Sequence, residues 1–171
     1  MNSAQLHLAF THVPVILSLT GSVMLIIALL MKNNTLVKTS YVVLVVAAIA
    51  AIPVFFSGDE AEEAVEHLPG VSESIISKHE SLATASMIAI SVAGGLALIA
   101  LLLYKQPMIL KAAKLLVLAV ALISGGLMAQ TAHLGGQIRH SEIRTGAASQ
   151  NNNEAGNENP SQENNNEKDD D

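Results

Sequence analysis

Histidines carry most of the chemistry that this sequence offers. The chain has six of them in 171 residues, at His7, His12, His67, His79, His133 and His140. Imidazole is a ligand for haem iron and for transition ions such as Zn and Cu, and it changes charge near neutral pH. There is no cysteine, which excludes disulfides, thiolate metal sites and the covalent attachment of c-type haem. Any bound cofactor must therefore be held by histidine, methionine or carboxylate side chains.

Long apolar runs must position these histidines. Hydrophobic residues make up 50% of the chain and charged residues only 14%, and a membrane span needs about 20 mostly apolar residues. Four runs without Lys, Arg, Asp or Glu meet that need, at 11–31, 39–56, 82–104 and 115–132. The sequence therefore predicts an all-α integral membrane protein, a four-helix up-down bundle formed by residues 1–144.

The connections between the predicted spans differ in charge. The first and third connections carry lysines and no acid, namely Lys32, Lys38, Lys105, Lys111 and Lys114. The second connection, 57–80, carries seven acids and only Lys78. The positive-inside rule then places the lysines in the cytoplasm and both termini on the outer side. All six histidines fall on that outer side.

The acidity of the chain lies in its last residues. Segment 145–171 has seven acids and one lysine, which accounts for the formal net charge of −6. It is rich in Asn and Glu and has no large apolar residue, so it cannot bury enough surface to offset the entropy of ordering. We expect a disordered tail.

The second connection contains helix signals. Ser57 and Ser77 each precede a glutamate by three residues, a spacing typical of a capping box. The first predicts a short amphipathic helix over 58–67, and the second starts the third long helix near His79. A start at Ser72 is the alternative, and it gives that helix at least one extra turn outside the membrane. With a start at Ser77, His79 lies in the first turn, where the helix dipole disfavours a charged imidazole.

The depths of the histidines indicate which of them can meet. At 1.5 Å per residue, His12 lies about 30 Å from Lys32 and His133 about 28 Å from Lys114. These two histidines are therefore expected at one level, with His79 a turn or two higher. For haem b, the predicted axial ligands are His12 with His79 or His133.

A metal ion such as Zn or Cu is the second cofactor hypothesis. Its predicted ligands are His12, His67, His79, His133 and Glu63. Glu63 and His67 share a helix face at spacing i, i+4, a spacing that also describes an ordinary solvated pair. The third hypothesis has no cofactor, with histidines that line an interface or respond to pH.

Glycine pairs at 94–95 and 125–126 lie inside the third and fourth spans, where small residues allow close helix packing.

Three segments carry a family resemblance. THVPVILSLTG, PVFFSGDEAEEAVEHLPGVSESIISKHE and TAHLGGQIRH resemble segments of bacterial four-helix inner-membrane proteins. The first also resembles the H-F-P opening of small bacterial membrane proteins for which haem b is the expected cofactor, although Val13 replaces the Phe. The resemblance covers the bundle and the second connection and implies a bacterial inner membrane with periplasmic termini. The matched positions are His12, Glu62, Glu63, His79 and His133.

Several function classes are excluded by the sequence. There is no nucleophile constellation, no phosphate-binding loop and no basic surface for nucleic acid, so an enzyme is disfavoured. We predict a subunit that binds haem b or a metal ion and transfers electrons, with the lipid bilayer and a quinol or periplasmic redox protein as partners. The alternative is a cofactor-free structural or accessory subunit of a larger membrane complex.

Overall fold

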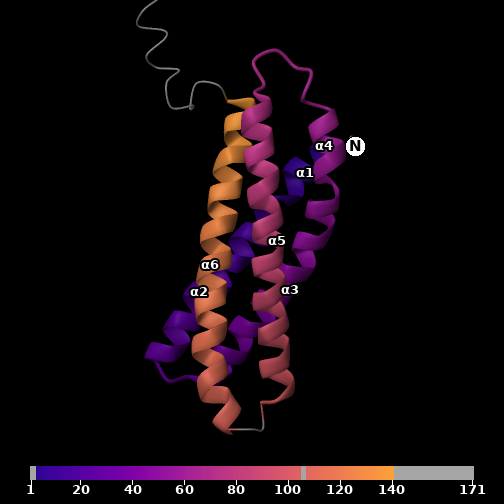
Figure 1. The fold of residues 1–171 in the computed structure, drawn as a ribbon. Helices are drawn as coiled ribbons and strands as arrows, with labels where there is room; N and C mark the ends of the chain where they lie inside the picture. Colours follow the sequence, from indigo (N-terminus) through magenta and orange to yellow (C-terminus); the bar gives the residue numbers. More distant parts are fainter. Residues whose placement is uncertain (1–2, 105–106, 141–171) are drawn as a thin grey trace, which may run out of the picture.

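The computed structural model describes residues 3–104 and 107–140, and the regular secondary structure of that part of the chain is helical (Figure 1). Two short helices accompany four long ones. The elements are α1 (Ser3–Phe10), α2 (His12–Leu30), α3 (Asn34–Phe56), α4 (Gly58–Glu63), α5 (Glu73–Leu102) and α6 (Pro107–Arg139). The long helices α2, α3, α5 and α6 run up and down side by side, and α1 and α4 lie together near one end. The predicted all-α up-down bundle is confirmed. The predicted tail, 145–171, lies outside the described residues.

The four long helices are suited to a lipid bilayer. The apolar helical stretches His7–Leu30, Asn34–Phe56, Glu73–Leu102 and Ala112–Ile138 are each long enough to span a membrane. Their outward faces carry large apolar side chains such as Ile49, which is 61% exposed, and Ile88, which is 62% exposed. Contact of this apolar surface with water is unfavourable, whereas its contact with lipid chains is not. The chain is a multi-pass membrane protein with four candidate spans.

The middle of the bundle is packed with small residues. Buried alanines from α2, α3, α5 and α6 surround a few larger side chains, including Leu25, Leu44, Ile90 and Val117. A Cβ added to Gly94 would lie only 2.5 Å from the Cβ of Ala48. A Cβ added to Gly95 would meet nothing within 4 Å. Only the first glycine of this pair therefore brings α5 close to α3.

The start of α5 follows the alternative expectation. Ser72 is extended, with φ −113° and ψ 116°, and α5 begins at Glu73. Gly70, which follows Pro69, has a φ of +81°, a conformation that glycine adopts easily. This residue forms a turn just before α5. His79 therefore lies in the second turn of α5, beyond the first turn where the helix dipole acts most strongly. The helix dipole therefore disfavours a charged His79 only weakly.

The bundle has two chemically different ends. The histidine end contains α1, α4, the start of α5 and the end of α6. The lysine end contains the α2–α3 connection, the end of α5 and the start of α6. At the lysine end the Nζ of Lys38 lies 3.3 Å from the centre of the Tyr104 ring, and the Nζ of Lys114 donates to Oδ1 of Asn34 at 2.8 Å. Asn33 caps α3 by accepting from the Leu36 N–H at 3.1 Å.

Candidate functional site

His79 turns into the bundle from α5. Its ring is half-buried, and Nδ1 lies 3.0 Å from the backbone carbonyl oxygen of Thr131 on α6. A carbonyl oxygen only accepts hydrogen bonds, so Nδ1 must carry the proton. Nε2 is then the ring nitrogen that can bind another group.

Gly135 makes room for this ring. A Cβ at that position would lie 3.1 Å from Cε1 of His79 and 3.5 Å from its Nδ1. Thr131 and Gly135 are four residues apart, on the same face of α6. Because α6 continues to Arg139, the Gly135–Gly136 pair does not end the helix. The glycine thus seats an imidazole against a continuous helix backbone.

A hydroxyl pair supports the contact between α5 and α6. The Thr131 Oγ1 donates to the carbonyl oxygen of Leu127 at 2.9 Å. It also lies 2.9 Å from Oγ of Ser86. Since the Thr131 hydroxyl has only one hydrogen, Ser86 is the donor in the second bond. Thr131 therefore joins Ser86 and His79, two residues separated by about two turns of α5.

His7 is held in the same manner from α1. Its Nδ1 lies 3.0 Å from Oγ of Ser57, the residue between α3 and α4. The Ser57 Oγ donates to the carbonyl oxygen of Val54 at 2.9 Å, so it accepts the hydrogen of His7 Nδ1. Ser57 serves His7 and does not cap α4 with its side chain. His7 and His79 lie near enough to each other that a positive charge on one ring would act on the other.

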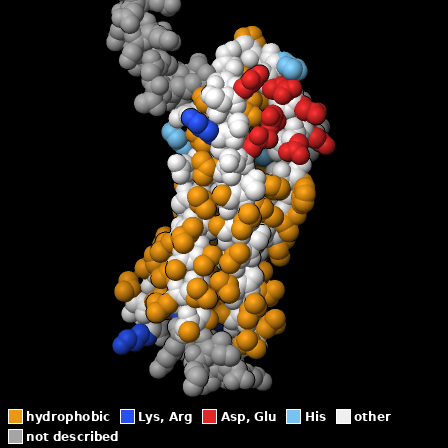
Figure 2. Space-filling model, viewed as in Figure 1, with side chains coloured by type: hydrophobic (Ala, Val, Ile, Leu, Met, Phe, Trp, Pro, Cys, Tyr) orange, Lys and Arg blue, Asp and Glu red, His pale blue; other side chains and the backbone are white. Residues whose placement is uncertain are grey.

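Carboxyl groups lie beside the His79 ring. Glu62 of α4 and Glu80 of α5 are hydrogen-bonded through their side chains. Partial burial raises the pKa of Glu62 to about 7, and the bond to Glu80 and the negative charges of Glu80, Glu66 and Asp59 contribute to the rise. Figure 2 shows acidic side chains gathered at the histidine end, above a wide apolar surface. The carboxyl pair connects α4 to α5 beside His79.

The other predicted ligands are exposed and take no part in these hydrogen bonds. His12 and Glu63 are exposed, and the His133 Nε2 contacts the Nε2 of Gln137 at 2.9 Å on the exposed face of α6. The side chain of His67 is 88% exposed, and its Nε2 lies 3.2 Å from Oε1 of Glu66. Because α4 ends at Glu63, before His67, the predicted helical pair of these two residues does not form. Helix α4 is shorter than the predicted segment 58–67.

The ligand set for a bare ion is incomplete in this arrangement. Within residues 3–104 and 107–140, no three or more His, Asp or Glu side chains are grouped so that they could hold a metal ion. What the structure does show is a pair of imidazoles, His7 and His79, that are each held through Nδ1 by an oxygen from a distant part of the chain. The sequence left the participation of His7 undecided, gave Ser57 only a capping role, and did not indicate that Thr131 or Gly135 contacts a histidine. No sequence motif points to these roles, because each of the three residues acts through a partner far away along the chain.

The geometry of the histidine end is the basis for assigning a function. No family model, curated protein or solved structure matches the chain. The resemblance to bacterial four-helix inner-membrane proteins therefore stays a prediction. The two imidazoles, the oxygens that hold them and the adjacent carboxyl pair must be interpreted from their own chemistry.

Proposed function

We propose that this membrane protein binds haem b through Nε2 of His7 and His79 and acts as an electron-transfer subunit. One observation carries the proposal: a protein oxygen accepts a hydrogen bond from Nδ1 of each ring. Histidines that bind metals nearly always donate their other ring nitrogen to such an oxygen, which fixes the tautomer and the orientation of the ring. The two rings also come from different helices, α1 and α5, as axial ligands in a bundle do.

The number of ligands favours haem over a free ion. A Zn or Cu site usually needs three or four protein ligands, and the described part of the chain has no group of three. A haem iron takes only its axial ligands from the protein. Haem b when bound would supply one-electron chemistry, and the protein would hold its iron through the two imidazoles. Neither ligand requires a cysteine.

The proposed orientation follows from charge. The lysine end would face the cytoplasm and the histidine end the periplasm of a bacterial inner membrane. A quinol in the outer leaflet or a periplasmic redox protein would then be the electron partner. Because the chain has no cysteine, Lys32→Cys and Ser74→Cys variants can be labelled singly in intact cells. A thiol reagent that does not cross membranes should label Ser74→Cys only, and labelling of Lys32→Cys alone would reverse the orientation.

The spectrum of the purified protein tests the haem proposal. Protein expressed with a haem precursor should show a Soret band that is lost in His7→Ala and in His79→Ala. His67→Ala is the matched control, because that ring is exposed on the same end. Loss of the band in His12→Ala or His133→Ala, with His7→Ala unaffected, would instead support the pair predicted from depth. Bound Zn or Cu with no Soret band would replace haem by an ion.

A cofactor-free accessory subunit is the second candidate. In such a protein the hydrogen bonds of His7 to Ser57 and of His79 to Thr131 would only link parts of the bundle, and no ligand would be needed. His79→Asn separates the two roles, because an Asn amide can donate to the Thr131 carbonyl in place of Nδ1 but is a poor iron ligand. If haem binds, this variant keeps its stability and loses the Soret band. A wild-type protein with neither haem nor metal would favour the accessory role.

A further inference from the structure

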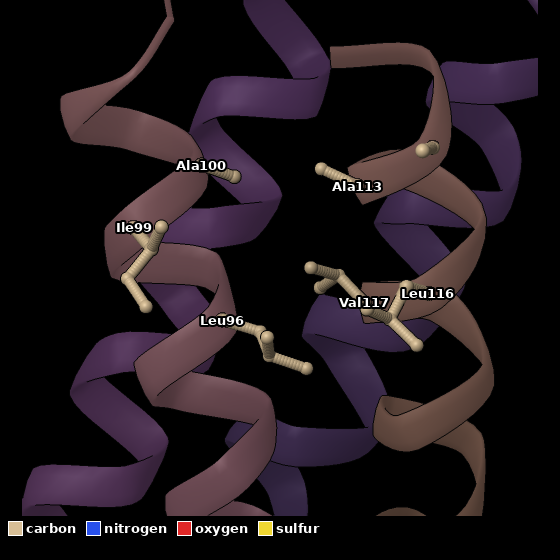
Figure 3. A pocket seen from close by; sticks show the side chains of 7 residues that line it. Leu96, Ile99, Ala100, Ala113, Leu116 and Val117 are labelled. Atoms are coloured by element: carbon tan, nitrogen blue, oxygen red, sulfur yellow. The ribbon is translucent and has the colours of Figure 1, made fainter. Parts of the chain in front are cut away.

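An apolar groove opens between α5 and α6 near the lysine end (Figure 3). It has a volume of about 420 Å³. Seven residues line it, and all are apolar: Leu96, Ile99, Ala100, Ala112, Ala113, Leu116 and Val117. A site with no polar side chain in its wall recognises chiefly the apolar part of a ligand.

Small side chains create the groove. Ala100 and Ala113 point toward each other from the two helices and leave the space between them unfilled (Figure 3). Ala100 and Val117 are 2% and 0% exposed and form the floor, whereas Ile99 and Leu116 are each 52% exposed and form the rim. The groove therefore opens toward the outer surface of the bundle, where lipid chains lie. A flexible hydrocarbon chain suits such a shape.

Two lysines, Lys114 and Lys38, lie at the same end of the bundle as the groove. Lys114 follows the lining residue Ala113 directly, and Tyr104, whose ring carries Lys38, lies four residues beyond the lining residue Ala100. Residues 1–58 and 81–141 contain no Asp or Glu. No Asp or Glu in these segments can therefore neutralise the two lysines. Lys114 contacts an amide and Lys38 an aromatic ring. The end of the groove is thus attractive to a negative charge.

We infer that this groove binds one acyl chain of an anionic phospholipid, with the headgroup phosphate near Lys114 and Lys38. Basic sites between membrane helices bind anionic headgroups by charge, and the groove adds shape recognition of the chain. A neutral isoprenoid tail would use the groove without the lysines, and a zwitterionic lipid would gain less from them.

Native mass spectrometry of the full chain tests this inference. Protein in detergent is mixed with vesicles of phosphatidylglycerol or phosphatidylcholine that have the same acyl chains, and the retained lipid is counted. We expect phosphatidylglycerol to be preferred by roughly 10- to 30-fold, because each of the two juxtamembrane lysines raises the affinity for an anionic group about fivefold. Equal retention of the two lipids would overturn the inference.

Two kinds of variant separate the groove from the lysines. Ala113→Phe fills the groove and should abolish the retained phosphatidylglycerol, whereas Ala119→Phe on the exposed face of the same helix should not. Lys114→Gln and Lys38→Gln leave the packing intact and should each reduce the preference several-fold. Retention unchanged in Ala113→Phe, or a preference unchanged in both lysine variants, would contradict the inference. If Ala113→Phe does not fold, the lysine variants decide.

Discussion

Glycine has different uses in the middle of the bundle and at its histidine end. In the middle, Gly94 brings the backbone of α5 against Ala48 and the Leu44 carbonyl of α3. At the histidine end, Gly135 of α6 receives the side chain of His79 instead of another helix. The first glycine sets the distance between helices, and the second sets the position of a ring. We therefore expect the first to control stability and the second to control the chemistry of the site.

The largest effect is expected for Gly94→Ala. The new methyl group would lie 2.5 Å from the Ala48 Cβ, and neither helix backbone can give way easily. Overpacking of this kind lowers the free energy of unfolding by about 1–3 kcal/mol, which thermal or denaturant unfolding in detergent would measure. Gly95→Ala is the control, with no atom within 4 Å of the new Cβ, and should change stability by no more than about 0.5 kcal/mol. Equal losses in the two variants would refute the assignment of Gly94 to helix contact.

Gly135→Ala should mainly disturb His79. Its Cβ would lie 3.1 Å from Cε1 of the ring, and a side chain can move by a few tenths of an ångström. The loss of stability should stay near 1 kcal/mol, while the bond of Nδ1 to Thr131 is lengthened. Nitrogen NMR of the labelled ring should show a changed Nδ1 signal. Gly126→Ala, with nothing within 4 Å, should leave that signal in place.

Ser86→Ala tests the hydroxyl pair beneath the histidine. It removes the donor to Thr131 Oγ1, and hydrogen bonds between membrane helices are worth about 0.6 kcal/mol on average. The backbone carbonyl that holds His79 remains, so the ring signal should shift less than in Gly135→Ala. A larger shift in Ser86→Ala would mean that the hydroxyl, and not Gly135, positions the ring.

The last prediction concerns the pH dependence of stability. The pKa of Glu62 is about 7 in the folded protein, against an ordinary value of 4.5, so the folded state binds its proton more tightly. The stability that the folded protein gains from binding this proton is complete below pH 4.5 and is lost as the pH rises through about 7. Unfolding measured from pH 5 to 8 should show this decline in the wild type and a flatter profile in Glu62→Gln. In Glu63→Gln, the exposed neighbour, the decline should persist.

Much of the fold could be predicted from the sequence. Four uncharged apolar runs determine four membrane helices, because the cost of placing charge in lipid adds up along a segment and needs no knowledge of its neighbours. The distribution of lysines and acids along the chain likewise separates the two ends of the bundle. The start of α5 was less determined, because Ser72 and Ser77 both offer a plausible cap and only the backbone at Gly70 and Ser72 decides between them.

The histidines show what only the tertiary structure decided. Sequence places six of them toward one end, but His12 faces outward whereas His7 and His79 turn toward partners on other helices. The partners Ser57 and Thr131 are fifty or more residues away along the chain. Hydropathy is a property of each segment, so the sequence reveals which segments enter the membrane. The rotation of a helix about its axis depends on how its side chains pack against the others, and that rotation decides which imidazoles meet.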